Sequence, residues 1–154
     1  MNRIMTGGIA ALALMGVADA SLAQPSPAAV AQARHEHFKQ IGGAAKTISD
    51  QLKSGKPVVS EVQMYAKRLD DLAPQLPSWF PPGTGPDAGV KTHAKADVWS
   101  KPAEFKTDAA AFAVEAHKLD VAAMSGDMAA VGAQMTAVNK TCKTCHMTFR
   151  EKDD

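Results

Sequence analysis

The segment from residue 128 to residue 149 has the most regular hydrophobic pattern in the chain. Its apolar and sulfur-bearing positions recur at steps of three and four, which is the pattern of one face of an α-helix packed in a bundle. These positions are Met128, Val131, Met135, Val138, Cys142, Cys145 and Phe149. The sequence therefore predicts a last helix whose two cysteines face the interior of a helical bundle, near one of its ends.

Cys142, Cys145 and His146 together form a Cys-x-x-Cys-His motif. This spacing is typical of the covalent attachment of haem c. On a helix the three residues stand at i, i+3 and i+4, so all three can face one flat ligand. The two thiols would add to the vinyl groups of the porphyrin, and the imidazole would bind the iron from one face. We predict one covalently attached haem c per chain, with His146 as the iron ligand.

A Cys-x-x-Cys-His motif also permits other interpretations. A dithiol redox pair usually opens a helix beside a strand, whereas this pair lies deep in a helix with no strand pattern nearby. A structural disulfide between positions i and i+3 of one helix would constrain almost nothing. A zinc site would need a further ligand from outside the motif. None of the other histidines, His35, His37, His93 and His117, lies at a spacing typical of a zinc ligand. The motif therefore favours haem c over these alternatives.

Residues 1–23 have the pattern of a secretory signal peptide. Arg3 precedes an apolar stretch over residues 4–17, and Ala23 ends a small-x-small cleavage site, with cleavage after Ala20 as the alternative. The segment is too short and too rich in glycine for a secure membrane span. We expect an exported protein in the periplasm, with no membrane span in the mature chain. Covalent attachment of haem in bacteria also takes place outside the cytoplasm.

Residues 24–154 are enough for one domain. The formal net charge of the whole chain is +1, and there is no basic block with interleaved aromatic residues. This composition argues against a nucleic-acid partner. The near-neutral balance says little about protein partners.

Three further helices are predicted from apolar stripes with the same spacing. The first ends at Gly55 and Pro57, and its stripe is Val30, Phe38, Ile41, Ala45, Ile48 and Leu52. The second begins near Ser60, and its stripe is Val62, Tyr65, Leu69, Leu72 and Leu76, with Met64 also expected in the core. The third begins at Pro102, and its stripe is Phe105, Ala109, Phe112, Ala116, Leu119 and Ala123.

Residues 75–100 are rich in proline, glycine and small polar residues, and they show no period of their own. Gly126 and Asp127, in contrast, indicate a tight turn between the last two helices. The predicted fold is all-α: an antiparallel four-helix bundle with a long crossover between helices 2 and 3.

Arg34 interrupts the apolar stripe of the first helix, four residues after Val30 and four before Phe38. A guanidinium at such a position is costly unless an anion or water meets it. It could extend out of the end of the bundle to water. With a haem present, a propionate is the obvious partner.

The mature chain resembles the class II c-type cytochromes, the cytochrome c′ group. The motif near the C-terminus carries most of this resemblance, because class I cytochromes c have it near the N-terminus. Four elements match in order: Arg34-x-x-x-Phe38, Trp79-Phe80-Pro81-Pro82-Gly83, Val98-Trp99 with Phe105, and the cysteine motif followed by Phe149-Arg150. Cytochrome c′ is itself an example of the four-helix bundle.

The resemblance implies roles for individual residues. Cys142 and Cys145 would form the thioethers, and His146 would be the proximal iron ligand. Arg34 matches an arginine that meets a haem propionate, and Arg150 matches one near the proximal face. In the same family, an apolar residue or a methionine lies over the distal face of the iron at the position of Phe38. Relatives are often antiparallel homodimers.

Two functions follow from these expectations. A phenyl ring at residue 38 cannot coordinate iron and offers no hydrogen bond, so we expect a five-coordinate haem that binds small gases such as nitric oxide and carbon monoxide. The alternative is a low-spin, six-coordinate electron carrier with His37 or another residue as the sixth ligand. Redox partner proteins are expected in either case, and an enzymatic activity is not.

Overall fold

The structure of the protein, a computed structural model, describes residues 24–152. The predicted signal peptide lies outside the described residues. The two alternative cleavage sites, after Ala20 and after Ala23, lie outside them as well.

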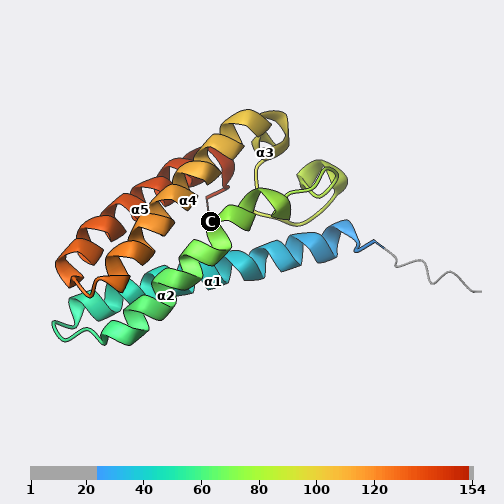
Figure 1. The fold of residues 1–154 in the computed structure, drawn as a ribbon. Helices are drawn as coiled ribbons and strands as arrows, with labels where there is room; N and C mark the ends of the chain where they lie inside the picture. Colours follow the sequence, from blue (N-terminus) through green and yellow to red (C-terminus); the bar gives the residue numbers. More distant parts are fainter. Residues whose placement is uncertain (1–23, 153–154) are drawn as a thin grey trace, which may run out of the picture.

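Four long helices form an antiparallel bundle (Figure 1). They are α1 (Pro27–Lys53), α2 (Val59–Leu72), α4 (Pro102–Met124) and α5 (Met128–Phe149). The helices α1 and α2, α2 and α4, and α4 and α5 pack side by side, whereas α1 and α5 touch along much less of their length. This arrangement confirms the predicted all-α, four-helix fold.

The ends of the long helices follow from local sequence. Ser26 caps α1, because its Oγ accepts a hydrogen bond of 3.2 Å from the backbone N of Ala29. Asp127 caps α5 in the same way, with Oδ1 accepting from the backbone N of Ala129 at 2.9 Å. Gly126 precedes it with a φ of 75°, a left-handed conformation that glycine adopts without strain. The predicted tight turn between the last two helices is present.

The segment from Ala73 to Lys101 connects α2 to α4 and lies at one end of the bundle (Figure 1). It differs from the prediction of a stretch without period, because it contains two 3₁₀ helices, η1 (Ala73–Trp79) and η2 (Pro86–Ala88), and one turn of α-helix, α3 (Asp97–Ser100). Its two halves are held together by Trp99, whose Nε1 donates to the backbone O of Pro81 at 3.0 Å. A Cβ at Gly85 would lie 2.7 Å from the Trp99 ring, so only glycine fits there.

The core agrees best with the predicted stripes on the last two helices. All six predicted positions of α4 are buried, and on α5 four of the seven are buried while the rest are partly buried. The prediction for α2 was wrong at Met64, which is 55% exposed. Tyr65 beside it is partly buried against the core, and the fully buried residues of α2 are Val62, Ala66 and Leu69.

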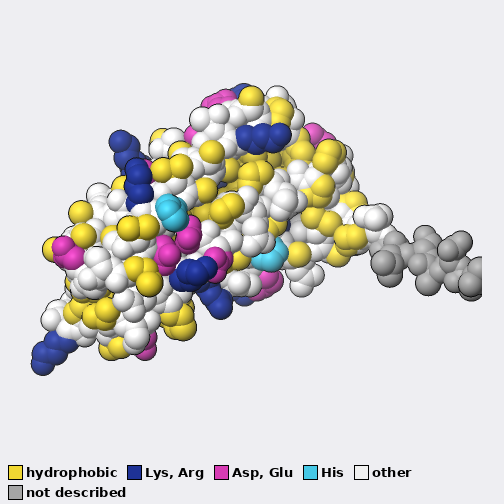
Figure 2. Space-filling model, viewed as in Figure 1, with side chains coloured by type: hydrophobic (Ala, Val, Ile, Leu, Met, Phe, Trp, Pro, Cys, Tyr) yellow, Lys and Arg dark blue, Asp and Glu magenta, His cyan; other side chains and the backbone are white. Residues whose placement is uncertain are grey.

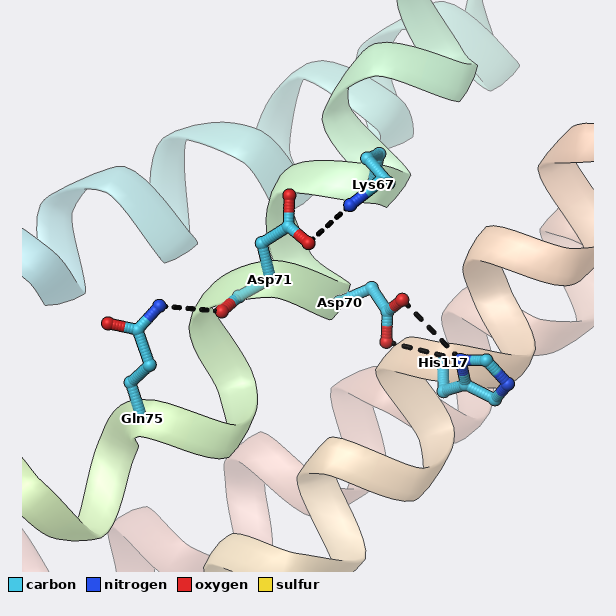
Figure 3. A network of polar contacts seen from close by, with 5 residues as sticks. All are labelled: Lys67, Asp70, Asp71, Gln75 and His117. Carbon is cyan, nitrogen blue, oxygen red and sulfur yellow. Dashed lines mark hydrogen bonds and ion pairs between the residues drawn. The ribbon is translucent and has the colours of Figure 1, made fainter.

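Charges of both signs are spread over the helices, and hydrophobic side chains are exposed over the connecting segment (Figure 2). Among the described residues, no helix is both long enough and apolar enough to cross a membrane. A polar network joins α2 to α4 on the surface (Figure 3). In it, His117 Nδ1 lies 3.3 Å from Asp70 Oδ1, Lys67 pairs with Asp71, and Gln75 donates to the backbone O of Asp71.

Asp120 lies next to this network, and its Oδ1 is buried without a hydrogen-bond partner among the described residues. Burial raises the pKa of the Asp120 carboxyl above its ordinary value, and the nearby carboxylate of Asp70 raises it further. Lys67 and His117 act in the opposite direction. The charged form of the Asp120 carboxyl is therefore less favourable in the folded protein than in the unfolded chain.

Candidate haem site

Cys142 and Cys145 lie on the face of α5 that packs against the core, close to the end of the helix. Both are free thiols and partly buried. Phe149, four residues after Cys145 on the same face, is buried, whereas His146 is exposed. The predicted placement of the cysteines toward the bundle interior agrees with the structure, although neither is completely covered.

The two thiols are held in their protonated form. Burial raises the pKa of the Cys142 thiol. The pKa of Cys145 rises to about 12, through burial first and then through the carboxylate of Asp108 and the neighbouring Cys142. A reactive dithiol pair and a thiolate metal ligand both need a lowered thiol pKa, so this environment does not favour either of them. Among residues 24–152, no group of three or more histidine, cysteine or acidic side chains is placed to hold a metal ion.

An aromatic cluster fills the same end of the bundle and consists of Phe38, Trp79, Phe80, Trp99, Phe105 and Phe149. The ring centroids of Phe38 and Phe80 lie 6.1 Å apart, those of Phe80 and Phe105 4.8 Å, and those of Phe105 and Phe149 5.3 Å. The rings meet edge to face, the geometry that aromatic pairs prefer. The cluster therefore extends from α1, through the connecting segment and α4, to the helix that carries the cysteines.

Arg34 is buried, with 3% of its surface exposed. Its Nη1 donates to the backbone O of Trp79 and to Thr84 Oγ1, both at 3.3 Å. Its Nη2 donates to the backbone O of Thr84 at 3.1 Å and to Thr92 Oγ1 at 3.0 Å. The guanidinium carbon also lies 4.5 Å from the centroid of the Phe80 ring, within the range of a cation–π contact.

All four hydrogen-bond acceptors of Arg34 are neutral oxygens of the connecting segment. The alternative in which the side chain extends to water is wrong, because the guanidinium is buried. Burial lowers the pKa of Arg34, but an arginine stays charged at neutral pH. The site therefore holds a buried positive charge, and its pairing with a haem propionate stays a prediction.

His37 lies next to Phe38 on α1, and its ring stacks on Trp79 with centroids 4.5 Å apart. Its Nδ1 is buried without a hydrogen-bond partner among the described residues. A buried ring nitrogen without a partner is unusual, because buried polar atoms are nearly always hydrogen-bonded. The prediction that His37 can serve as a sixth ligand stays open.

The chain beyond α5 pairs with the end of the connecting segment. The backbone N of Lys95 donates to the O of Phe149 at 2.9 Å, and the backbone N of Glu151 donates to the O of His93 at 2.8 Å. Ala94 and Arg150 form an antiparallel bridge between them. A hollow of about 610 Å³ opens beside this bridge, and its lining includes His146 and Arg150.

The sequence reasoning missed Thr84 and Thr92 as partners of Arg34. Neither residue belongs to a motif, and both lie in the segment without periodicity. The one signal in the sequence was Arg34 itself, because a charge on an apolar stripe demands partners that local spacing cannot identify.

The residues at this end of the bundle fit a haem c. A haem is a large, flat and mostly apolar group with two carboxylates on one edge. Partly buried, protonated thiols of Cys142 and Cys145 lie beside an aromatic cluster, and His146 is adjacent on the exposed side. The buried cation of Arg34 lies in the same region, in contact with Phe80.

The family model of cytochrome c′ matches residues 29–150, which is most of the chain. The chain belongs to the cytochrome c′ family. A curated cytochrome c′ from Pararhodospirillum photometricum is 42% identical over 127 residues, covering 82% of this chain and 99% of the relative. Family membership makes the chain a haem c protein, and it confirms the resemblance seen in the sequence.

Solved structures of the cytochrome c′ family have the same fold as this chain. One is a cytochrome c′ with ligand-controlled dimer dissociation, 25% identical, with a TM-score of 0.78; the match covers 84% of this chain and 100% of that one. Another is the nitric oxide complex of a variant cytochrome c′ from Alcaligenes xylosoxidans, also 25% identical, with a TM-score of 0.74 and coverage of 82% and 97%. Nitric oxide binding and dimer formation are therefore properties of similar proteins.

Proposed function

We propose that the protein is a periplasmic haem c protein with a five-coordinate iron that binds small uncharged gases, nitric oxide above all. The observation that carries this proposal is Phe38. Its ring lies in the aromatic cluster, in edge contact with Trp79 and Phe80. The resemblance to the family assigns this residue to the distal face of the iron. A phenyl ring neither coordinates iron nor donates a hydrogen bond. A bound haem would supply an iron atom that binds diatomic gases and changes oxidation state.

Each residue of the candidate site would have its own role in holding the haem or controlling access to it. Cys142 and Cys145 would hold the haem covalently against α5, and His146 would bind the iron on the exposed side. Arg34 would bring a positive charge to one edge of the group, where a propionate can accept from it. Phe38 would exclude water and polar ligands while giving way to small apolar ones. Arg150 would lie near the proximal face.

The arrangement also suits electron transfer, and one observation favours a different iron ligation for it. The buried, unpartnered Nδ1 of His37 indicates a ring that could turn from Trp79 toward a better partner. In this second candidate function, His37 would be the sixth ligand of a low-spin electron carrier. Redox partner proteins would then dock at the haem edge.

The proposal also covers export, oligomeric state and the absence of an enzymatic activity. Residues 1–23 would direct export and be removed, and residues 24–154 would form the haem-binding bundle. The protein would form homodimers, as similar cytochromes do. We propose no enzymatic activity, because the phenyl ring of Phe38, expected at the distal position, offers no acid, base or hydrogen-bond donor for catalysis.

An absorption spectrum of the ferric and ferrous protein, with and without nitric oxide and carbon monoxide, tests the proposal. We expect a high-spin spectrum that changes on addition of either gas. A low-spin ferric spectrum that the His37→Ala substitution abolishes would establish the second candidate instead. A colourless protein purified from the periplasm would contradict both.

A further inference from the structure

The connecting segment is attached to α1 at one end and to the terminus of α5 at the other. On the α1 side, Arg34 donates to Trp79, Thr84 and Thr92. These contacts fall at three points of the segment, at the end of η1, before η2 and after η2. Because the guanidinium is buried and each terminal nitrogen makes two hydrogen bonds, this attachment has little freedom.

On the α5 side, the attachment is made by backbone groups. The N of Lys95 donates to the O of Phe149, and the N of Glu151 donates to the O of His93. Between them, the backbone N of Arg150 donates to the O of His146 at 3.2 Å and closes the last turn of α5. The residue after the helix is therefore tied both to the connecting segment and to His146.

Thr92 is the point at which the two attachments meet. Its Oγ1 accepts from Arg34 Nη2 at 3.0 Å and from the backbone N of Ala94 at 3.2 Å. Ala94 is the residue that pairs with Arg150. One hydroxyl oxygen thus links a buried guanidinium on α1 to the bridge that ends α5.

We infer that Thr92 is a positioning residue, which transmits the placement of Arg34 to Arg150 and to the turn that carries His146. This inference rests on the proposed function, because it assigns His146 to the iron. Partners outside the immediate ligands commonly set the orientation of a ligating histidine and the properties of its metal. Thr92 acts on the proximal side in this way, although Arg34 belongs to α1 and not to α5, the helix that carries His146.

The test compares Thr92→Val with the unsubstituted haem-loaded protein. Valine keeps the shape of threonine and removes the oxygen that accepts both hydrogen bonds. We expect the amide hydrogens of Lys95 and Glu151 to exchange about fivefold faster, the factor that one ordinary hydrogen bond contributes. We also expect a shift of the iron–histidine stretching band of the ferrous protein in resonance Raman spectra.

Two variants serve as controls. Thr107→Val makes the same chemical change at an exposed position of α4, where the hydroxyl donates only to the backbone O of Ala103, and should change neither measurement. Thr92→Ser restores the acceptor oxygen and should restore both values.

Unchanged exchange at Lys95 and Glu151 in Thr92→Val would overturn the inference. Faster exchange with an unmoved iron–histidine band would overturn it too, because Thr92 would then serve the fold alone. Failure of the proposed function looks different, since the unsubstituted protein would then show no iron–histidine band. In that case amide exchange alone decides whether Thr92 holds the segment.

Discussion

Replacing Arg34 by leucine removes the side chain that makes four hydrogen bonds from α1 to the connecting segment. Leucine fills a similar apolar volume, so the main loss is that of four hydrogen bonds to neutral oxygens. Two of the acceptors are buried backbone carbonyls, of Trp79 and Thr84, for which residues 24–152 offer no other donor. The threonine hydroxyls can turn toward other partners.

The magnitude follows from these contacts. Each buried carbonyl left without a donor costs about 1–3 kcal/mol. Removing the guanidinium also removes its own cost of burial, which the lowered pKa of Arg34 reflects. We expect a net loss of about 2–4 kcal/mol in the free energy of unfolding. For a domain of this size this corresponds to a fall of roughly 6–12 °C in the melting temperature.

Urea unfolding of the haem-loaded protein, followed by far-ultraviolet circular dichroism, measures this loss. Arg68→Leu is the matched control, because Arg68 is exposed on α2 and the same replacement there should stay within about 0.5 kcal/mol of the parent. A loss below about 1 kcal/mol in Arg34→Leu would refute the reasoning about the carbonyls. The redox potential is a separate readout: if it and its pH dependence are unchanged, Arg34 does not meet a propionate.

Three further predictions concern other parts of the molecule. Replacing either Cys142 or Cys145 by alanine should prevent normal covalent attachment, and protein expressed without haem should melt without cooperativity; a compact, cooperatively melting apo-protein would contradict this. Phe38→Ala should speed the binding of nitric oxide and carbon monoxide in stopped-flow measurements, at a cost of about 2 kcal/mol in stability because the ring is only partly buried; unchanged association rates would exclude Phe38 as the steric gate. Burial and Asp70 raise the folded-state pKa of Asp120 above its ordinary value of 3.8, so the folded protein binds more protons than the unfolded chain, and stability is lost as the pH rises through this range. Asp120→Asn should therefore stabilise the protein by a few tenths of a kcal/mol at neutral pH, allowing for solvent screening, and leave stability unchanged near pH 3, as denaturation at the two pH values would show.

The helices that pack through one continuous face could be read from the sequence. On α4, all six residues of the predicted stripe are buried, because large side chains alternate with alanine at regular steps. The last helix was equally clear, and its Cys-x-x-Cys-His motif is local in the chain. The spacing of Cys142, Cys145 and His146 is sufficient to predict a haem, because one helix supplies all three residues.

Helix α2 agreed with its predicted stripe at Val62 and Leu69, which are fully buried, but not at Met64. Met64 lies two residues after Val62, and such a step turns a side chain to the other side of a helix. Met64 was placed in the core by its apolar character, although it is exposed. The three- and four-residue steps identify the buried face, whereas apolar character alone does not.

Four helices, the cysteine motif and a charge on an apolar stripe can all be predicted from the amino-acid sequence. The contacts of that charge cannot, since Thr84 and Thr92 lie 50 and 58 residues from Arg34. The same holds for the pairing of Ala94 with Arg150. These contacts depend on how an aperiodic segment returns over the end of the bundle. Local spacing carries no information about such a path, because the partners meet only after the helices have packed.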